Sequence, residues 1–227
     1  MVSTTPQTPT PVPSAIPQPM GERRVVFYNL SWQAYQQISQ ALGEGRSARL
    51  TFDDGTLEIT MPSAEHENFG EWIGLFIRVL VEELGLKIKS MGSTTLTYPD
   101  LNKSPEPDRA YYIQNQPSVT GKKIDFAQDP PPDLVVEVDI THTDINKPRL
   151  YAAIGIPEFW RFNGQVLRIH HLQGQQYAEV EASPTFPNVP KSRLYEFLEQ
   201  CQVDEVGASK ALRAWVQQEL QNSELGR

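Results

Sequence analysis

Apolar residues recur at helical spacing in two stretches of the first half of the chain. Residues 32–42 (WQAYQQISQAL) follow Asn29 and Ser31, which are candidate N-caps. Residues 63–85 begin at a serine, end at a glycine and carry a continuous apolar face. Both stretches therefore predict amphipathic helices.

Alternating and continuous apolar runs predict strands elsewhere. Residues 49–60 contain an Asp-Gly pair between two alternating runs, which is typical of a β-hairpin. Residues 87–98 are strand-like, and residues 105–114 place an aspartate directly before a β-prone run. Residues 133–141 (DLVVEVDIT) are apolar apart from their carboxylates, which predicts a central strand covered on both faces.

The order of helix, hairpin, helix, strands, helix and strands predicts a mixed α/β domain over residues 23–227. Residues 1–22 instead hold six prolines among Thr, Ser and Gln. Such a segment buries too little apolar area to offset its ordering entropy, so we expect a disordered tail. A ligand for a proline-recognising partner is the alternative. The remaining predicted elements are a helix over 147–154, strands over 157–164 and 165–181, and helices over 193–200 and 208–221.

Composition narrows the class of protein. The net charge is −8, with 28 acidic and 20 basic residues, which argues against a protein that coats DNA but not against an enzyme with a local basic groove. Cys201 is the sole cysteine, so no intrachain disulfide and no cysteine-based zinc cluster can form. No apolar run is long enough to span a bilayer, and no secretory signal is visible. We expect a cytoplasmic protein.

Three carboxylates occupy positions where apolar residues are expected. Asp108 stands at the head of a strand, Glu137 lies within the apolar run, and Asp139 follows on the same face because strand side chains alternate. Buried carboxylates need a partner, and neighbouring ones repel each other, so a divalent cation is an attractive partner. Oxygen ligands of this kind favour Mg²⁺ or Mn²⁺ over zinc.

Lys147 follows ten residues after Glu137, at the start of the predicted short helix. A lysine beside a metal-bound carboxylate cluster can orient or deprotonate a water, or stabilise charge on a phosphate. These parts suit the hydrolysis of a phosphodiester. The alternative is a structural ion pair, in which Glu137 or Asp139 pairs with Arg149 or Arg161.

Several motifs resemble the Uma2 family (DUF820) of restriction endonuclease-like proteins, which is abundant in cyanobacteria. They are MPSAEHENFGEWIGLFIRVLVEEL, EPDRAYYIQN, PPDLVVEVDIT and YAAIGIPEFWR, and the resemblance covers about residues 24–218. It implies the PD-(D/E)XK nuclease fold, a central mixed sheet flanked by helices, here with an N-terminal helix and hairpin and C-terminal helices.

The resemblance also implies a site. Asp108 matches the first metal ligand and Glu137 the acidic ligand of the (D/E)XK strand. Glu67 is our choice for the acid that often completes the site from the preceding helix, with Glu65 second. Asp139 stands where the family's lysine is expected, so Lys147 is the candidate for a lysine displaced to the next helix. Asp139 is then either an additional ligand or a partner that holds Lys147.

The expected function is a Mg²⁺- or Mn²⁺-dependent endonuclease that hydrolyses DNA, with Asp108 and Glu137 holding the metal. The alternative is a catalytically silent protein of the same fold that binds nucleic acid or protein; a structural dimer is a third possibility. A homodimer is expected because nucleases of this fold often pair to cut both strands. The candidates for contacts with the nucleic-acid backbone are Lys87, Lys89, Arg109, Lys122 and Lys123.

Overall fold

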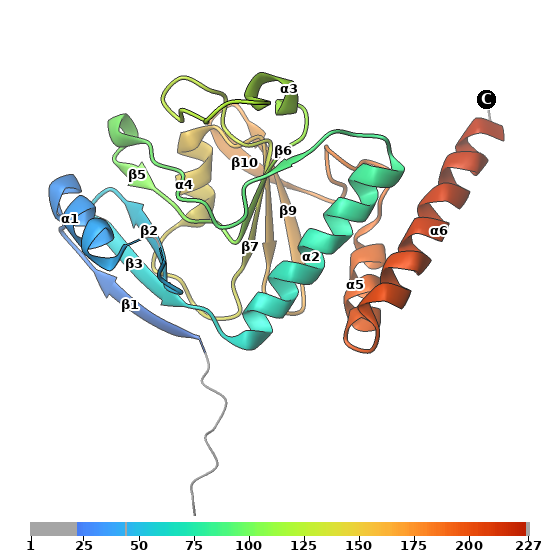
Figure 1. Ribbon diagram of the computed structural model, residues 1–227, viewed down its shortest axis with the longest axis horizontal. Helices are drawn as coiled ribbons and strands as arrows, with labels where there is room; N and C mark the ends of the chain where they lie inside the picture. Colours follow the sequence, from blue (N-terminus) through green and yellow to red (C-terminus); the bar gives the residue numbers. More distant parts are fainter. Residues whose placement is uncertain (1–21, 44, 226–227) are drawn as a thin grey trace, which may run out of the picture.

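The protein is built from two β-sheets that lie against each other, and the larger sheet carries helices on its outer side (Figure 1). The structure, a computed structural model, describes residues 22–43 and 45–225, with side chains as far as residue 222. The predicted mixed α/β fold, with a central mixed sheet flanked by helices, is confirmed.

The larger sheet contains six strands: β4 (Lys89–Ser90), β6 (Arg109–Tyr112), β7 (Leu134–Val138), β8 (Glu158–Phe162), β9 (Leu167–Gln173) and β10 (Gln176–Val180). Their order is β10-β9-β8-β7-β6-β4. β7 and β8 are parallel, whereas the other neighbours are antiparallel. β7 is buried along its whole length, as predicted for a central strand covered on both faces.

The smaller sheet contains four strands: β1 (Arg23–Phe27), β2 (Arg49–Asp53), β3 (Thr56–Met61) and β5 (Lys103–Ser104). Their order is β1-β3-β2-β5, and all neighbours are antiparallel. β2 and β3 form the predicted hairpin. Asp54 and Gly55 at its tip have positive φ angles of 46° and 91°, which a tight two-residue turn of this kind requires.

The helices begin and end close to the predicted positions. Ser31 and Ser63 cap the first two long helices by accepting hydrogen bonds from backbone amides, at Ala34 and His66 respectively. Gly155 ends the short helix in the left-handed conformation that glycine tolerates. The helices are α1 (Trp32–Leu42), α2 (Ala64–Glu83), a 3₁₀ turn (Pro99–Leu101), α3 (Gln116–Val119), α4 (Lys147–Ile154), α5 (Lys191–Cys201) and α6 (Glu205–Leu225).

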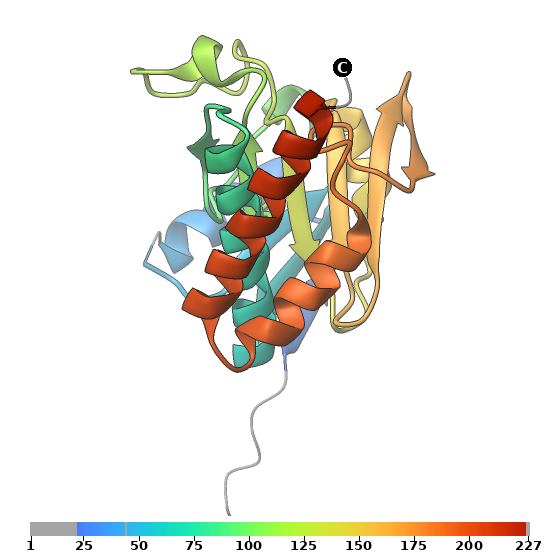
Figure 2. The same cartoon turned by 90° about the vertical axis from the view of Figure 1, so that its right-hand side faces the viewer.

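The two faces of the larger sheet bury different clusters. On the outer face, Val136 and Trp160 pack with apolar residues of α2, α5 and α6, and Figure 2 shows α5 and α6 on this side. On the inner face, Val135 and Phe159 pack with residues of α4 such as Leu150. The smaller sheet has a cluster of its own under α1. Its buried members are Tyr35, Leu50, Phe52 and Leu57.

Two regions differ from the sequence-based expectation. The strand predicted over residues 87–98 is largely wrong, because pairing stops at Ser90 and the chain then turns at Gly92. β1 was not predicted, since it is an edge strand that depends on pairing with β3. The proposed tail lies outside the described residues apart from Glu22, so the division into tail and domain stays a prediction. None of the described helices combines the length and apolar character needed to cross a membrane.

We expect Phe76→Ala to lower the free energy of unfolding by about 3–5 kcal/mol, because it empties a fully buried position against Phe197 between α2 and α5. Val203→Ala, at a position that is 90% exposed, should change it by less than about 0.5 kcal/mol. Chemical denaturation of both variants measures the difference. Equal effects would contradict the packing of α2 against the C-terminal helices.

Candidate active site between the two sheets

Strand alternation directs two of the predicted carboxylates into the space between the sheets. Val135 and Glu137 share the inner face of β7, and Ala110 shares that face on the neighbouring β6. Asp108 lies two residues before Ala110 and therefore points to the same side. Asp108 and Glu137 are only 2% and 3% exposed.

Asp108 is held from three directions. Its Oδ2 atom accepts a hydrogen bond of 2.6 Å from the backbone amide of Val138, which fixes the carboxylate across the β6–β7 pair. Its Oδ1 atom lies 2.8 Å from Nε2 of His66 and also accepts a hydrogen bond from Arg49 of β2. The carboxylate therefore joins both sheets and the first turn of α2.

His66 links Asp108 to the start of the described chain. Its Nδ1 atom lies 2.8 Å from Oε2 of Glu22, so the imidazole stands between two carboxylates. Nε2 also lies 2.9 Å from the guanidinium of Arg49, so the tautomer of the imidazole decides which nitrogen donates. Burial favours the neutral form of Glu22, but hydrogen bonds from His66, Thr141 and Arg24 outweigh it and lower the pKa of this carboxyl to about 2.

Glu137 accepts hydrogen bonds from two side chains of α4. Lys147, the first residue of this helix, donates a hydrogen bond of 2.8 Å to Oε2 of Glu137, and the hydroxyl of Tyr151 donates to Oε1. Burial favours the neutral form of Lys147, but the charges of Glu137 and Asp139 outweigh it and hold the lysine pKa above its ordinary value. A lysine in this state is a charged donor and does not accept a proton.

Asp139 serves as a partner of basic side chains. It accepts hydrogen bonds of 2.6 Å from Lys147 and 2.8 Å from Arg161. Although burial favours its neutral form, these two cations hold the pKa of Asp139 below its usual range. The ion pair with Arg161 considered from the sequence is therefore present at Asp139, together with the contact to Lys147. Arg149 instead lies 3.4 Å from Asp54.

A small cavity joins these groups. Its volume is about 20 Å³, enough for one water or one ion, and Asp108, Glu137 and Lys147 all line it. Asp139 is not among its lining residues. The remaining lining residues come from the facing side of the smaller sheet, from α2 and from the segment before β6: Arg24, Arg49, Thr51, Glu58, Thr60, His66 and Glu106.

The donor set agrees in kind with a divalent cation, because Asp108 and Glu137 offer hard carboxylate oxygens to one cavity. Both carboxylates already have protein donors, so an ion would have to displace at least one of them, such as Arg49 at Asp108. Within residues 22–43 and 45–225, no group of three or more His, Cys, Asp or Glu is placed to hold a metal together. Glu58 and Glu106 also line the cavity, but the carboxylates that the structure describes around it are not arranged as a complete protein cage.

The family model of Uma2, described as "Putative restriction endonuclease", matches residues 32–203. The chain belongs to the Uma2 family. Among solved structures it is similar to a putative nuclease belonging to DUF820 from Anabaena variabilis ATCC 29413. The two chains are 17% identical with a TM-score of 0.49, and the match covers 74% of this chain and 99% of that one. No curated protein matches the chain.

The residue that α2 places in the cavity of this Uma2 protein is His66, and not Glu67 or Glu65, which were chosen from the sequence. Glu67 has a side chain that is 48% exposed and bonds to Arg49 at 2.7 Å, outside the cavity. Glu65 is also exposed. His66, between them, is buried. The sequence held one signal for this residue. His66 lies seven residues before the apolar Ile73, so both side chains lie on the same face of the helix.

Arg49 and Glu22 were also missed. The alternation of β2 places Leu50 and Phe52 under α1, so Arg49 has to face the larger sheet. That inference needs the strand to be recognised as covered on one side by a helix. Glu22 carries no comparable signal, because its contact with His66 is made across 44 residues of sequence.

The lysines and arginines proposed for backbone contacts lie outside the cavity. Arg109 pairs with Glu71, and Lys122 pairs with Asp129. Lys89 donates to backbone carbonyls of Val119 and Lys122. Lys87 and Lys123 are exposed. Their role in binding nucleic acid stays a prediction.

The depressed pKa of Glu22 predicts a pH-dependent contribution to stability. A carboxyl with a pKa of about 2 in the folded state and 4.5 as its ordinary value stabilises the fold above about pH 4.5 and loses this effect as the pH falls toward 2. Glu22→Gln should therefore lower the free energy of unfolding at pH 7, and the deficit should shrink between pH 4.5 and 2. Urea denaturation across this range measures it.

Glu181→Gln is the matched control, because the Glu181 side chain is 96% exposed. Its ion pair with Lys191, at 3.5 Å, is exposed to solvent, so the variant should change the free energy of unfolding by less than about 0.5 kcal/mol at every pH. A deficit in Glu22→Gln that stays constant from pH 7 to 2 would contradict the ionised contact between Glu22 and His66.

Proposed function

We propose that the protein is a metal-dependent nuclease that hydrolyses phosphodiester bonds of DNA. One observation carries the proposal. Asp108, Glu137 and Lys147 come from different parts of the fold, yet all three line one small cavity. The family description, a restriction endonuclease, supports nuclease activity in general. Nucleases of this fold generally use divalent metals, and carboxylate oxygens favour Mg²⁺ or Mn²⁺.

Each residue has a distinct part in the proposed reaction. Asp108 and Glu137 would hold the ion, which when bound supplies an activated water and neutralises charge on the phosphate. Lys147, kept protonated by Glu137 and Asp139, donates hydrogen bonds and stabilises negative charge that develops on the phosphate oxygens. Arg161 holds Asp139, which in turn orients Lys147. Tyr151 fixes the second oxygen of Glu137.

A second candidate function is a catalytically silent protein that binds nucleic acid or another protein. The specific observation in its favour is that the oxygens of Asp108 and Glu137 are all engaged by protein donors. The displaced lysine and the net charge of −8 agree with it. The two candidates differ in one property, namely whether the cavity binds a divalent ion.

Cleavage assays separate the two. We expect wild type with Mg²⁺ or Mn²⁺ to nick supercoiled plasmid and to cut a single-stranded circle. Glu137→Gln and Lys147→Met should each reduce the rate by about a hundredfold or more, because each removes a charge from the proposed transition-state environment. Glu181→Gln, an exposed carboxylate away from the cavity, should cleave like wild type.

Cutting that survives Glu137→Gln would contradict the proposed site. An inert wild type that also shows no heat of Mg²⁺ or Mn²⁺ binding in calorimetry would favour the silent alternative. The homodimer belongs to the same proposal, and analytical ultracentrifugation measures it. If the protein is strictly monomeric and still cleaves, the predicted homodimer is wrong and the proposed nuclease activity stands.

A further inference from the structure

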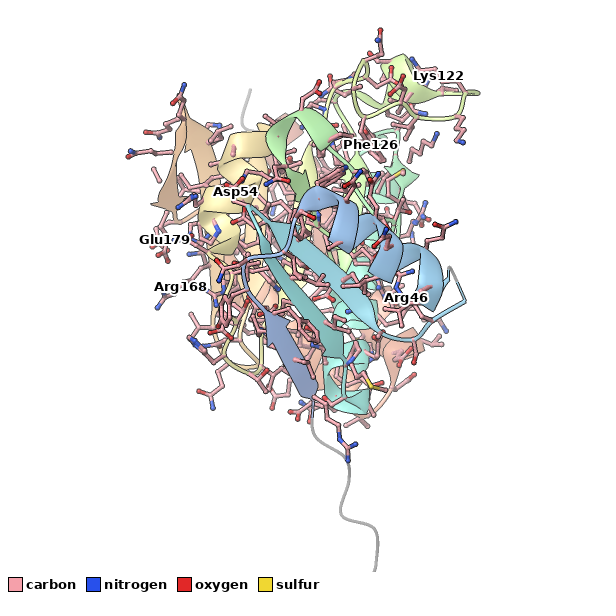
Figure 3. All side chains as sticks on the ribbon, turned by 90° about the vertical axis from the view of Figure 1, so that its left-hand side faces the viewer. Arg46, Asp54, Lys122, Phe126, Arg168 and Glu179 are labelled. Atoms are coloured by element: carbon pink, nitrogen blue, oxygen red, sulfur yellow. The ribbon has the colours of Figure 1, made fainter. Side chains whose placement is uncertain are left out.

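A cleft of about 770 Å³ lies next to the small cavity. Arg49 and Glu106 line both spaces, so these two side chains lie between the cleft and the cavity that Asp108 and Glu137 line. Its walls come from the end of β3, from residues 46–49 and from the loop over residues 93–95. Figure 3 places Arg46, on this wall, and Asp54, at the hairpin tip, at opposite ends of the smaller sheet.

The walls carry the groups that bind a sugar–phosphate backbone. Arg46 and Arg49 contribute guanidinium groups, and Ser93 contributes a hydroxyl. The hydroxyls of Thr94 and Thr95 also line the cleft but already donate within the protein, to a backbone carbonyl and to Glu106 respectively. Arginines and hydroxyls are among the groups that contact phosphates in protein–nucleic acid complexes. Beside them the side of the cleft includes Met61, which is 48% exposed, and a proline, and these offer apolar surface to a base.

The small volume and limited basic surface of the cleft favour one strand over an intact duplex. Its volume falls in the range of about 300–1,000 Å³ typical of sites for small organic ligands. A duplex is gripped through many phosphates over a broad basic surface. Here the basic contribution comes from two arginines, which are already opposed by Glu67, Glu106 and Asp108.

Arg49 is placed to exchange these carboxylates for a phosphate. Its guanidinium contacts Asp108, Glu67 at 2.7 Å and His66 at 2.9 Å, and it lies at the junction of the cleft and the cavity. The planar fork of arginine matches a phosphate as well as a carboxylate. If Arg49 turned to a phosphate, Oδ1 of Asp108 would lose its arginine donor and keep only the contact with His66.

We propose that this cleft binds an unpaired strand of nucleic acid and that Arg49 leaves Asp108 to contact the phosphate next to the cavity. This rests on the proposed nuclease function, since it names the substrate form and the residue that receives it. Binding of the strand and of the ion at Asp108 then favour each other, because both require Arg49 to move away from Asp108.

The test is binding of a fluorescein-labelled single-stranded oligonucleotide, followed by fluorescence anisotropy with Ca²⁺ in place of Mg²⁺. Wild type should bind this probe more tightly than a blunt duplex of the same length. Arg49→Gln should weaken binding about ten- to a hundredfold. It should also reduce the slope of log K against log salt by about 0.7, the share of one phosphate contact on a single strand. Arg213→Gln removes an equally paired arginine, between Glu82 and Glu83, and should bind like wild type.

A second pair of variants guards against loss of folding in Arg49→Gln. Ser93→Asp adds a negative charge to an exposed position on the cleft wall and should weaken binding, whereas Ser192→Asp at an exposed position of α5 should not. Normal binding by a folded Arg49→Gln, equal affinity for strand and duplex, or no binding at all would each overturn the inference. Cleavage decides the proposed function separately. If the variants bind as expected but the wild type does not cleave, the strand-binding cleft is supported and the nuclease function is contradicted. If the wild type cleaves but the variants do not bind as expected, the nuclease function is supported and the strand-binding cleft is contradicted.

Discussion

The structure depends on neutralising carboxylates that are buried between its two sheets. An ionised carboxylate without a partner in such a position would cost several kcal/mol. The basic partners come from the smaller sheet, from the segment between α1 and β2 and from the first residue of α4, so these charges constrain where the elements can lie. The pairs are Arg49 with Asp108, Arg24 with Glu58, Arg46 with Glu106, and Lys147 with both Glu137 and Asp139.

Much of the fold could be predicted from the sequence because it is encoded locally. The Asp-Gly pair of the hairpin, the serine caps of α1 and α2 and the glycine after α4 each act within a few residues. The buried run of β7 is equally local, and its two carboxylates stood out because hydrocarbon was expected there. Glu137 and Lys147 form an ion pair in the structure, although ten residues separate them and the family's motif places its lysine at the position of Asp139.

The rest of the site could not be predicted because it arises from contacts distant in sequence. His66 meets Asp108 across 42 residues, and Arg49 meets the same carboxylate across 59. A single sequence shows the residue types but not which first-turn side chain faces inward. Glu67 was chosen because of its charge, whereas the orientation of α2 buries the neighbouring His66. The short pairing of β4 likewise depends on a turn at Gly92 that the strand-like composition hides.

The smaller sheet keeps its own apolar cluster, centred on Phe52, separate from those of the larger sheet. The side chains that face the cavity from each sheet are polar or charged, so ion pairs and not apolar contacts join the two sheets there. The two sheets are therefore joined at the proposed site by buried ion pairs, which salt screens far less than it screens pairs on the surface.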